Sequence, residues 1–182
     1  MGAIGLFPSS TGPVSVTMRL IGLFVALLFA LIAAPLASAP PEQSGLPLPR
    51  FVSLRADKAN LRAGPGDQYP IKFVYQRPGL PLEVVAEYFN WRKVRDHQGT
   101  EGWMHQNMLT GRRYAIVIGE AQTLRAKPDV TAAAIAVVDP LVTARLRTCR
   151  AASPWCEVEV KGMRGWLKRS GLWGVYADEV IE

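Results

Sequence analysis

Alternating apolar and polar residues indicate short strands downstream of residue 50. Residues 82–88 read LEVVAEY, which would place Leu82, Val84, Ala86 and Tyr88 on one face. Residues 156–160 read CEVEV, in strict alternation. A period of two is typical of half-buried strands, and glycines and prolines punctuate the chain about every ten residues, as between the strands of a small barrel. The pattern therefore predicts an all-β fold.

Three short motifs recur in the same order, so the chain contains an internal repeat. They are LRAGP at 61–65 and LRAKP at 124–128, WxxV at 91–94 and 155–158, and GW at 102–103 and 165–166. The shift is 63 residues for the first and third motifs and 64 for the second. Such a period indicates two copies of one structural unit. We predict two small domains, residues 51–117 and 118–182.

The N-terminal segment has the pattern of a secretory signal peptide. Arg19 precedes a charge-free apolar run, Leu20–Ala34, which is followed by Ala37-Ser38-Ala39. We expect residues 1–39 to be a cleaved signal, with Met18 as an alternative start, and the mature protein to be exported to the periplasm.

Pro40 keeps a second interpretation open, because proline after the cleavage point disfavours signal peptidase. An uncleaved segment 20–39 would just reach the ~20 residues that a membrane span needs, and would tether the same exported protein. Residues 40–50 contain four prolines and are predicted to be an extended linker.

Composition limits the functional classes. The 182 residues include 21 Lys and Arg against 15 Asp and Glu, a net charge of +6, which favours anionic partners. Nucleic acid is the usual partner of a basic barrel, but export argues against it and favours the cell wall. His97 and His105 precede both cysteines, Cys149 and Cys156, which excludes a Cys₂His₂ zinc finger. We expect no metal and no cofactor.

The motifs resemble the bacterial SH3 domain (SH3b). The resemblance rests on ANLRAGPG at 59–66, WxxV at 91–94 and GTEGWM at 99–104, and in the second copy on GWL at 165–167 and LWGVY at 172–176. It covers residues 51–177. It implies a five-stranded SH3-like barrel per repeat, export, and ligands among cell-wall, proline-rich or cross-bridge peptides. Lys127 and Asp129 replace Gly64 and Gly66 of the first copy, so this loop is expected to differ in shape.

The two cysteines are predicted to form a disulfide. They lie at the ends of two presumed strands of one hairpin, and an exported protein with two cysteines usually pairs them. The apolar positions Ala144 and Leu146 are out of phase with Cys149, so the bridge requires a bulge in that strand.

No catalytic constellation is found. Glu83, Glu87, Asp96 and Glu101 could supply a carboxylate pair, but we expect them on solvated strand faces. Metal binding by Asp96, His97 and His105 is the weaker alternative, because turn formation explains His97.

Aromatic residues suggest where a ligand binds. We predict a peptide groove in the first repeat; its residues are Tyr69, Tyr75, Tyr88, Trp91, Lys93 and Arg95. A structural edge position is an equal interpretation of Trp91. Trp103 and Trp166 are predicted to be core residues, and the second repeat, with Trp155, to be chiefly a structural mate.

The sequence thus favours a non-catalytic exported binding module for cell-wall peptide, peptidoglycan or an envelope protein. A small cell-wall hydrolase of unfamiliar type and a periplasmic scaffold remain as alternatives. We expect no contact with nucleic acid, and contact with the membrane only through an uncleaved signal.

Overall fold

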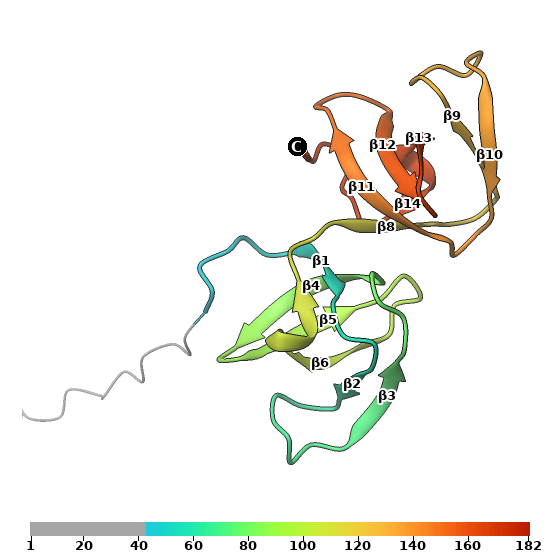
Figure 1. The fold of residues 1–182 in the computed structure, drawn as a ribbon. Helices are drawn as coiled ribbons and strands as arrows, with labels where there is room; N and C mark the ends of the chain where they lie inside the picture. The colour runs from blue at the N-terminus through green and yellow to red at the C-terminus, as the bar shows by residue number, and fades with distance from the viewer. Residues whose placement is uncertain (1–42) are drawn as a thin grey trace, which may run out of the picture. The chain divides into compact units, whose positions relative to one another are not determined.

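The computed structural model describes residues 43–182. The predicted signal peptide lies outside the described residues. Those that are described belong to one compact unit and form two seven-stranded antiparallel sheets (Figure 1), so the all-β prediction is confirmed. In this part of the chain no helix is both long and apolar enough to cross a membrane.

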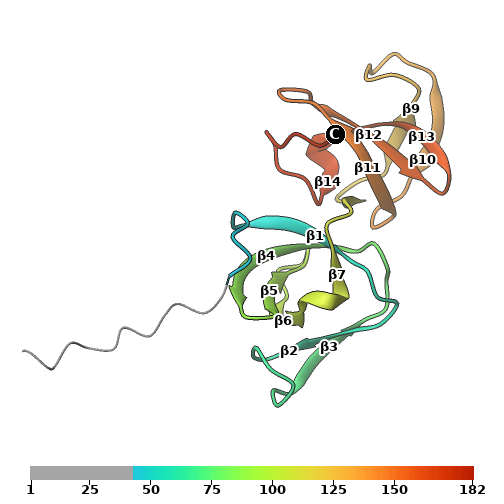
Figure 2. The same cartoon turned by 60° about the vertical axis from the view of Figure 1, so that its left-hand side comes forward.

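The first sheet has the strand order β3-β2-β6-β5-β4-β1-β7. Its elements are β1 (Arg50–Leu54), β2 (Ala59–Arg62), β3 (Ile71–Tyr75), β4 (Pro81–Tyr88), β5 (Trp91–Arg95), β6 (Glu101–His105), the 3₁₀ helix η1 (Gln106–Met108) and β7 (Leu109–Thr110). The sheet curls into a barrel, as Figure 2 shows from a second direction.

The second sheet repeats this arrangement element by element, in the order β10-β9-β13-β12-β11-β8-β14. Its elements are β8 (Tyr114–Val117), β9 (Gln122–Arg125), β10 (Ala134–Val138), β11 (Thr143–Cys149), β12 (Trp155–Val160), β13 (Met163–Lys168), the 3₁₀ helix η2 (Arg169–Gly171) and β14 (Leu172–Trp173). Each sheet has seven strands instead of the implied five, and the two-residue strands β7 and β14 are among the additional ones.

The boundary between the repeats lies earlier than predicted. β8 pairs with β11 and β14, so it belongs to the second sheet, and a boundary between residues 117 and 118 is wrong by one strand. The first repeat also begins earlier than a linker over residues 40–50 implies, because Ser44 is already bonded to the sheet. Ser44 donates hydrogen bonds to Glu87 from its backbone N (2.7 Å) and its Oγ (2.7 Å).

The recurring glycine before tryptophan has a packing cause. A Cβ on Gly102 would lie 2.6 Å from Cγ of Leu61 and 2.8 Å from the carbonyl oxygen of Arg62. A Cβ on Gly165 would lie 2.7 Å from Cγ of Leu124. Only glycine therefore lets β6 approach β2, and β13 approach β9, closely enough to close each barrel.

The tryptophans of these motifs are not core residues, which corrects the prediction. Because side chains alternate along a strand, the fully buried Met104 and Leu167 point into the cores, and Trp103 and Trp166 are half-buried on the opposite face. Trp103 stands opposite Arg62 of the neighbouring strand.

A bulge changes the face of β4 halfway along. The pairing register with β5 shifts between Val84 and Ala86. Leu82 and Val84 are fully buried, whereas Ala86 and Tyr88 lie on the outer face. The prediction of one apolar face over residues 82–88 is therefore wrong beyond the bulge.

β11 carries the bulge that the cysteine phase requires. Its register with β12 shifts between Leu146 and Thr148, which brings Cys149 into the core. Cys149 and Cys156 form the predicted disulfide, with their Cα atoms 4.4 Å apart.

Candidate functional site

The predicted groove of the first repeat is not assembled as one surface. Tyr75 is buried, 6% exposed, and its hydroxyl donates a 2.8 Å hydrogen bond to Oδ2 of Asp96. Burial, and then the bond to Asp96, raise the pKa of Tyr75. Tyr69 lies apart in the β2–β3 loop, where its ring occupies the space beside Gly64. Tyr75 is therefore a core residue, and the prediction that it lines a groove is wrong.

The remaining groove residues do share the outer face of β4 and β5. Tyr88 stands directly opposite Trp91, and its ring packs edge-on against Phe89 with centroids 4.9 Å apart. The cations are occupied, because Lys93 pairs with Glu101 at 2.7 Å, and Arg95 pairs with Glu83 at 2.5 Å. This face offers aromatic surface without unpaired positive charge.

Three of the four candidate carboxylates of the first repeat are buried, contrary to the expectation of solvated faces. Glu83, Glu87 and Asp96 are only 5–7% exposed. Glu83 accepts from Arg95 and also from the hydroxyl of Tyr176 at 2.8 Å. Oδ1 of Asp96 accepts the backbone N–H groups of the turn that follows it. These acids are engaged in structural bonds that hold strands and turns together.

Glu87 is the most heavily bonded of these acids. Its Oε1 accepts from Arg50 Nη2 (2.5 Å) and Ser44 Oγ (2.7 Å), and its Oε2 accepts from Ser44 N (2.7 Å). Arg92 Nε forms an ion pair with Oε1 at 3.0 Å. Burial alone would raise the pKa of Glu87, but hydrogen bonds from Ser44 and Arg50 outweigh it and lower this pKa to about 2. The carboxyl is therefore ionised at neutral pH.

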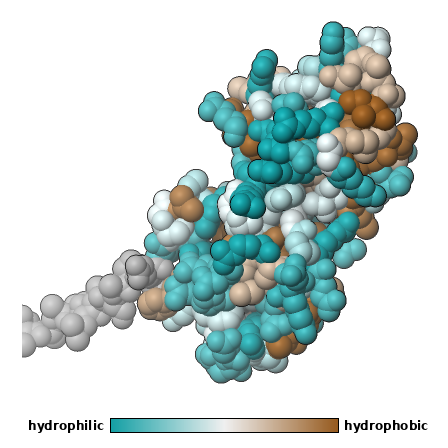
Figure 3. Space-filling view, in the orientation of Figure 1, coloured by the Kyte–Doolittle hydropathy of each residue, from teal (hydrophilic) through white to brown (hydrophobic). Residues whose placement is uncertain are grey.

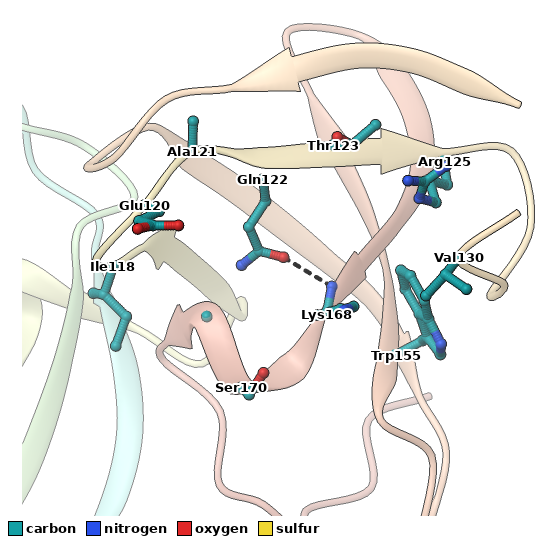
Figure 4. Close-up of a pocket in the computed structure, with 11 residues that line it drawn as sticks. Ile118, Glu120, Ala121, Gln122, Thr123, Arg125, Val130, Trp155, Lys168 and Ser170 are labelled. Carbon is teal, nitrogen blue, oxygen red and sulfur yellow. Dashed lines mark hydrogen bonds between the residues drawn. The ribbon is translucent and has the colours of Figure 1, made fainter. Parts of the chain in front are cut away.

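Two adjoining hollows lie in the second repeat, around Trp155. Figure 4 shows the smaller of the two. Their volumes are about 530 Å³ and about 730 Å³, within the range of small-ligand and peptide sites. Four residues line both: Val130, Trp155, Lys168 and Ser170. We call the pair the Trp155 hollow.

The loop before Trp155 is held in place by short-range bonds. The disulfide joins the two ends of this loop, at Cys149 and Cys156. Inside it, Oγ of Ser153 accepts from the backbone N of Trp155 (3.2 Å) and donates to its carbonyl oxygen (3.1 Å). Trp155 is 8% exposed, so its indole is fixed by packing and little of it is open to the hollow.

A buried arginine holds the opposite wall. Arg169 is 6% exposed. Its guanidinium donates from Nη2 to the carbonyl oxygen of Arg150 (2.9 Å) and from Nη1 to those of Tyr176 (3.3 Å) and Ala177. One side chain thus ties the disulfide loop to the C-terminal segment, which pre-organises the wall for a ligand.

Gln122 sits at the other end of the hollow, beside η2. Its Oε1 accepts from the backbone N of Lys168 at 2.9 Å (Figure 4), whereas its Nε2 is buried without a hydrogen-bond partner in the described residues. A Cβ on Gly171 would lie 2.1 Å from that nitrogen, so a larger residue there would displace the Gln122 amide. An amide N–H without a partner is a donor available to an incoming carbonyl group.

The rim of the hollow carries an apolar side chain and charges of both signs. Val130 is 57% exposed, and Figure 3 shows hydrophobic surface over the β9–β10 hairpin, where Ile135 and Val137 are also exposed. Lys168 and Asp178 line the rim. Such a surface suits a peptide that offers both aliphatic and charged groups.

A sequence signal for this site existed in the replaced glycines. Oδ1 of Asp129 accepts from the backbone N (2.7 Å) and Oγ1 (2.8 Å) of Thr131, which shapes the turn that carries Val130. Hydrogen bonds from Thr131 lower the pKa of Asp129. The backbone hydrogen bonds of this loop nevertheless match those of the first copy, with Asp129 N bonded to Lys127 O as Gly66 N is to Gly64 O. The expected difference in loop shape is therefore wrong, and the replacements change only the side chains on this rim of the hollow.

Metal binding has no cluster to support it in residues 43–182, where no three His, Cys, Asp or Glu side chains gather as a set of possible ligands.

Comparison with known proteins gives a family match. A family model described as "Bacterial SH3 domain" matches the chain twice, over residues 55–111 and 119–174. No curated protein matches the chain.

Several solved structures are similar to the chain. NlpC1 from Trichomonas vaginalis is 10% identical, with a TM-score of 0.32 over 76% of this chain and 51% of that chain. NlpC2 from the same organism is 9% identical, with a TM-score of 0.32 over 69% and 48%. An NlpC/P60 family protein from Bacillus cereus is 13% identical, with a TM-score of 0.31 over 68% and 55%. The chain spans about half the length of these structures.

Proposed function

The chain belongs to the bacterial SH3 domain family, and we propose that it is an exported, non-catalytic module that binds a cell-wall peptide in the Trp155 hollow. Bacterial SH3 domains generally bind cell-wall components and are typically extracellular. The observation that carries the proposal is the position of Trp155, a packed indole between two adjoining hollows.

The hollow supplies the elements that peptide recognition needs. The exposed side chain of Val130 and the small exposed part of the Trp155 indole offer apolar contact, which supplies most of the binding energy at such sites. The amide of Gln122 can donate to a peptide carbonyl, and Lys168 can pair with a peptide carboxylate. Because the disulfide and Arg169 fix the walls before binding, little conformational entropy is lost on association.

The non-catalytic part of the proposal rests on the state of the acids. Glu83, Glu87 and Asp96 are buried in structural bonds, and hydrolysis of a glycosidic bond needs a pair of carboxylates that face the substrate. A zymogram with peptidoglycan in the gel tests this part, because a clear band would establish the hydrolase alternative.

Binding itself is tested by co-sedimentation of the purified protein with isolated sacculi. The matched sample is sacculi from which an amidase has removed the stem peptides. We expect the protein to sediment with intact sacculi and to stay in solution with the peptide-free ones. Equal sedimentation with both would assign binding to the glycan, and no sedimentation with either would favour an envelope protein as partner; both results would overturn the proposal.

A further inference from the structure

A second hollow, of about 630 Å³, shares no residue with the Trp155 hollow. Its apolar walls are Leu46, Pro47, Phe51, Val52, Val84, Leu109, Val180 and Ile181. Three arginines line it as well, Arg50, Arg92 and Arg113, together with the polar Ser44, Gln106 and Thr110. Among the described residues no acidic side chain faces it. We call it the arginine hollow.

Two guanidinium N–H groups here have no partner. Nη1 of Arg50 and Nε of Arg113 are both buried without a hydrogen bond in the described part of the chain. The side chains of these residues are only 17% and 18% exposed. A buried donor on a charged group is costly to leave unpaired, so these two groups add positive charge beside the hollow that no hydrogen bond offsets.

The neighbouring acids cannot fill this role, because their oxygens are already used. Glu87 accepts from Arg50 and twice from Ser44, and forms an ion pair with Arg92. Glu179 accepts both terminal nitrogens of Arg113 and the backbone N of Tyr176. Three arginines therefore share two carboxylates, and one positive charge is left without a counterion.

We infer that the arginine hollow binds the free α-carboxylate of a peptide that ends in an aliphatic residue. One carboxylate matches the uncompensated charge, and its two oxygens suit the planar donors of a guanidinium. The apolar walls would take the aliphatic side chain. This inference stands on residues separate from those of the proposed wall-peptide site and does not depend on it.

The test uses N-acetyl-L-leucine as the probe and N-acetyl-L-leucinamide as its matched control. The two differ by the carboxylate alone. We expect N-acetyl-L-leucine to shift the Nε–H resonance of Arg113 in ¹⁵N–¹H spectra of the purified protein, and the amide to bind about tenfold more weakly or not at all. Equal binding of both compounds, or binding of neither, would overturn the inference.

Substitution at Val180 provides the second arm. This side chain is 52% exposed and lines the hollow, so a polar residue there should leave the fold intact. Val180→Glu places a tethered carboxylate at the rim and should abolish probe binding, whereas Val180→Gln should retain it. Equal loss in both variants would mean that bulk at the rim is responsible, and unchanged binding in both would mean that the probe sits elsewhere; either result contradicts the assignment.

Discussion

The disulfide between Cys149 and Cys156 closes the loop that ends at Trp155, with the two Cα atoms 4.4 Å apart. The same loop supplies Ala152, Ser153 and Pro154 to the Trp155 hollow. The covalent link and the proposed binding wall are therefore one structural feature.

Replacing both cysteines by serine should destabilise the second barrel and weaken binding. A closed loop of this length contributes about 2.5 kcal/mol through the entropy of the unfolded chain, and both sulfur atoms leave a fully buried site. We expect a lower midpoint in urea denaturation and a several-fold loss of binding to sacculi. The wild-type protein in reductant is the control and should show the same loss of stability and binding as the double serine variant. Unchanged stability in the variant and in the reduced wild type would contradict a stabilising role for the disulfide.

Gly165→Ala should destabilise the protein because the barrel closes at this point. The added methyl group would lie 2.7 Å from Leu124 Cγ, and overpacking of this kind costs about 1–3 kcal/mol. Gly111→Ala is the matched control, because a Cβ there meets no atom within 4 Å. Urea denaturation should show a lower free energy of unfolding for Gly165→Ala and little change for Gly111→Ala. Equal effects would mean that the close approach of β13 to β9 does not determine stability.

Stability should fall in acid as Glu87 becomes protonated. The pKa of this carboxyl is about 2 in the folded protein against 4.5 ordinarily. A lowered folded-state pKa contributes stability that is complete above pH 4.5 and is lost as the pH falls towards 2. Glu87→Gln should therefore be less stable at neutral pH, and its unfolding free energy should fall less steeply through this range, by up to about 1.4 kcal/mol per pH unit.

Glu159→Gln provides the comparison for the acid series. Glu159 also has a lowered pKa, owing first to its bond from Arg147, but its side chain is 27% exposed, so solvent screens the pair. Its pH profile should follow that of the wild type. A Glu87→Gln profile parallel to the wild type would show that the buried acid does not control acid stability.

The fold was predictable because its signals are local or repeated. Period-two alternation indicated the strands, and the constant shift of 63 residues indicated two copies. The same shift, applied to Phe51, gives Tyr114, the first residue of β8. The true boundary between the repeats could therefore also have been predicted from the sequence.

The candidate site was less predictable, because bulges and buried charge pairs decide which side chains face outward. A bulge in β4 moves Tyr88 to the outer face, and ion pairs bury Glu83 and Glu87. Neither effect can be predicted from the alternation of apolar and polar residues, because no residue pattern in the sequence shows where a bulge lies. The Trp155 hollow depends on Arg169 bonding carbonyl groups on both sides of it in the sequence, those of Arg150 and Tyr176, a relation that exists only in the folded protein.

The most direct test of the proposed function blocks one repeat at a time. Ser170 is exposed in η2 and lines both parts of the Trp155 hollow; Asn107 is its exposed counterpart in η1 of the first repeat. Both can be replaced by tryptophan without burying new bulk in a core. In co-sedimentation with sacculi, Ser170→Trp should lose binding by about tenfold or more, and Asn107→Trp should bind like the wild type. Loss in Asn107→Trp with retention in Ser170→Trp would place the site in the first repeat and contradict the central claim.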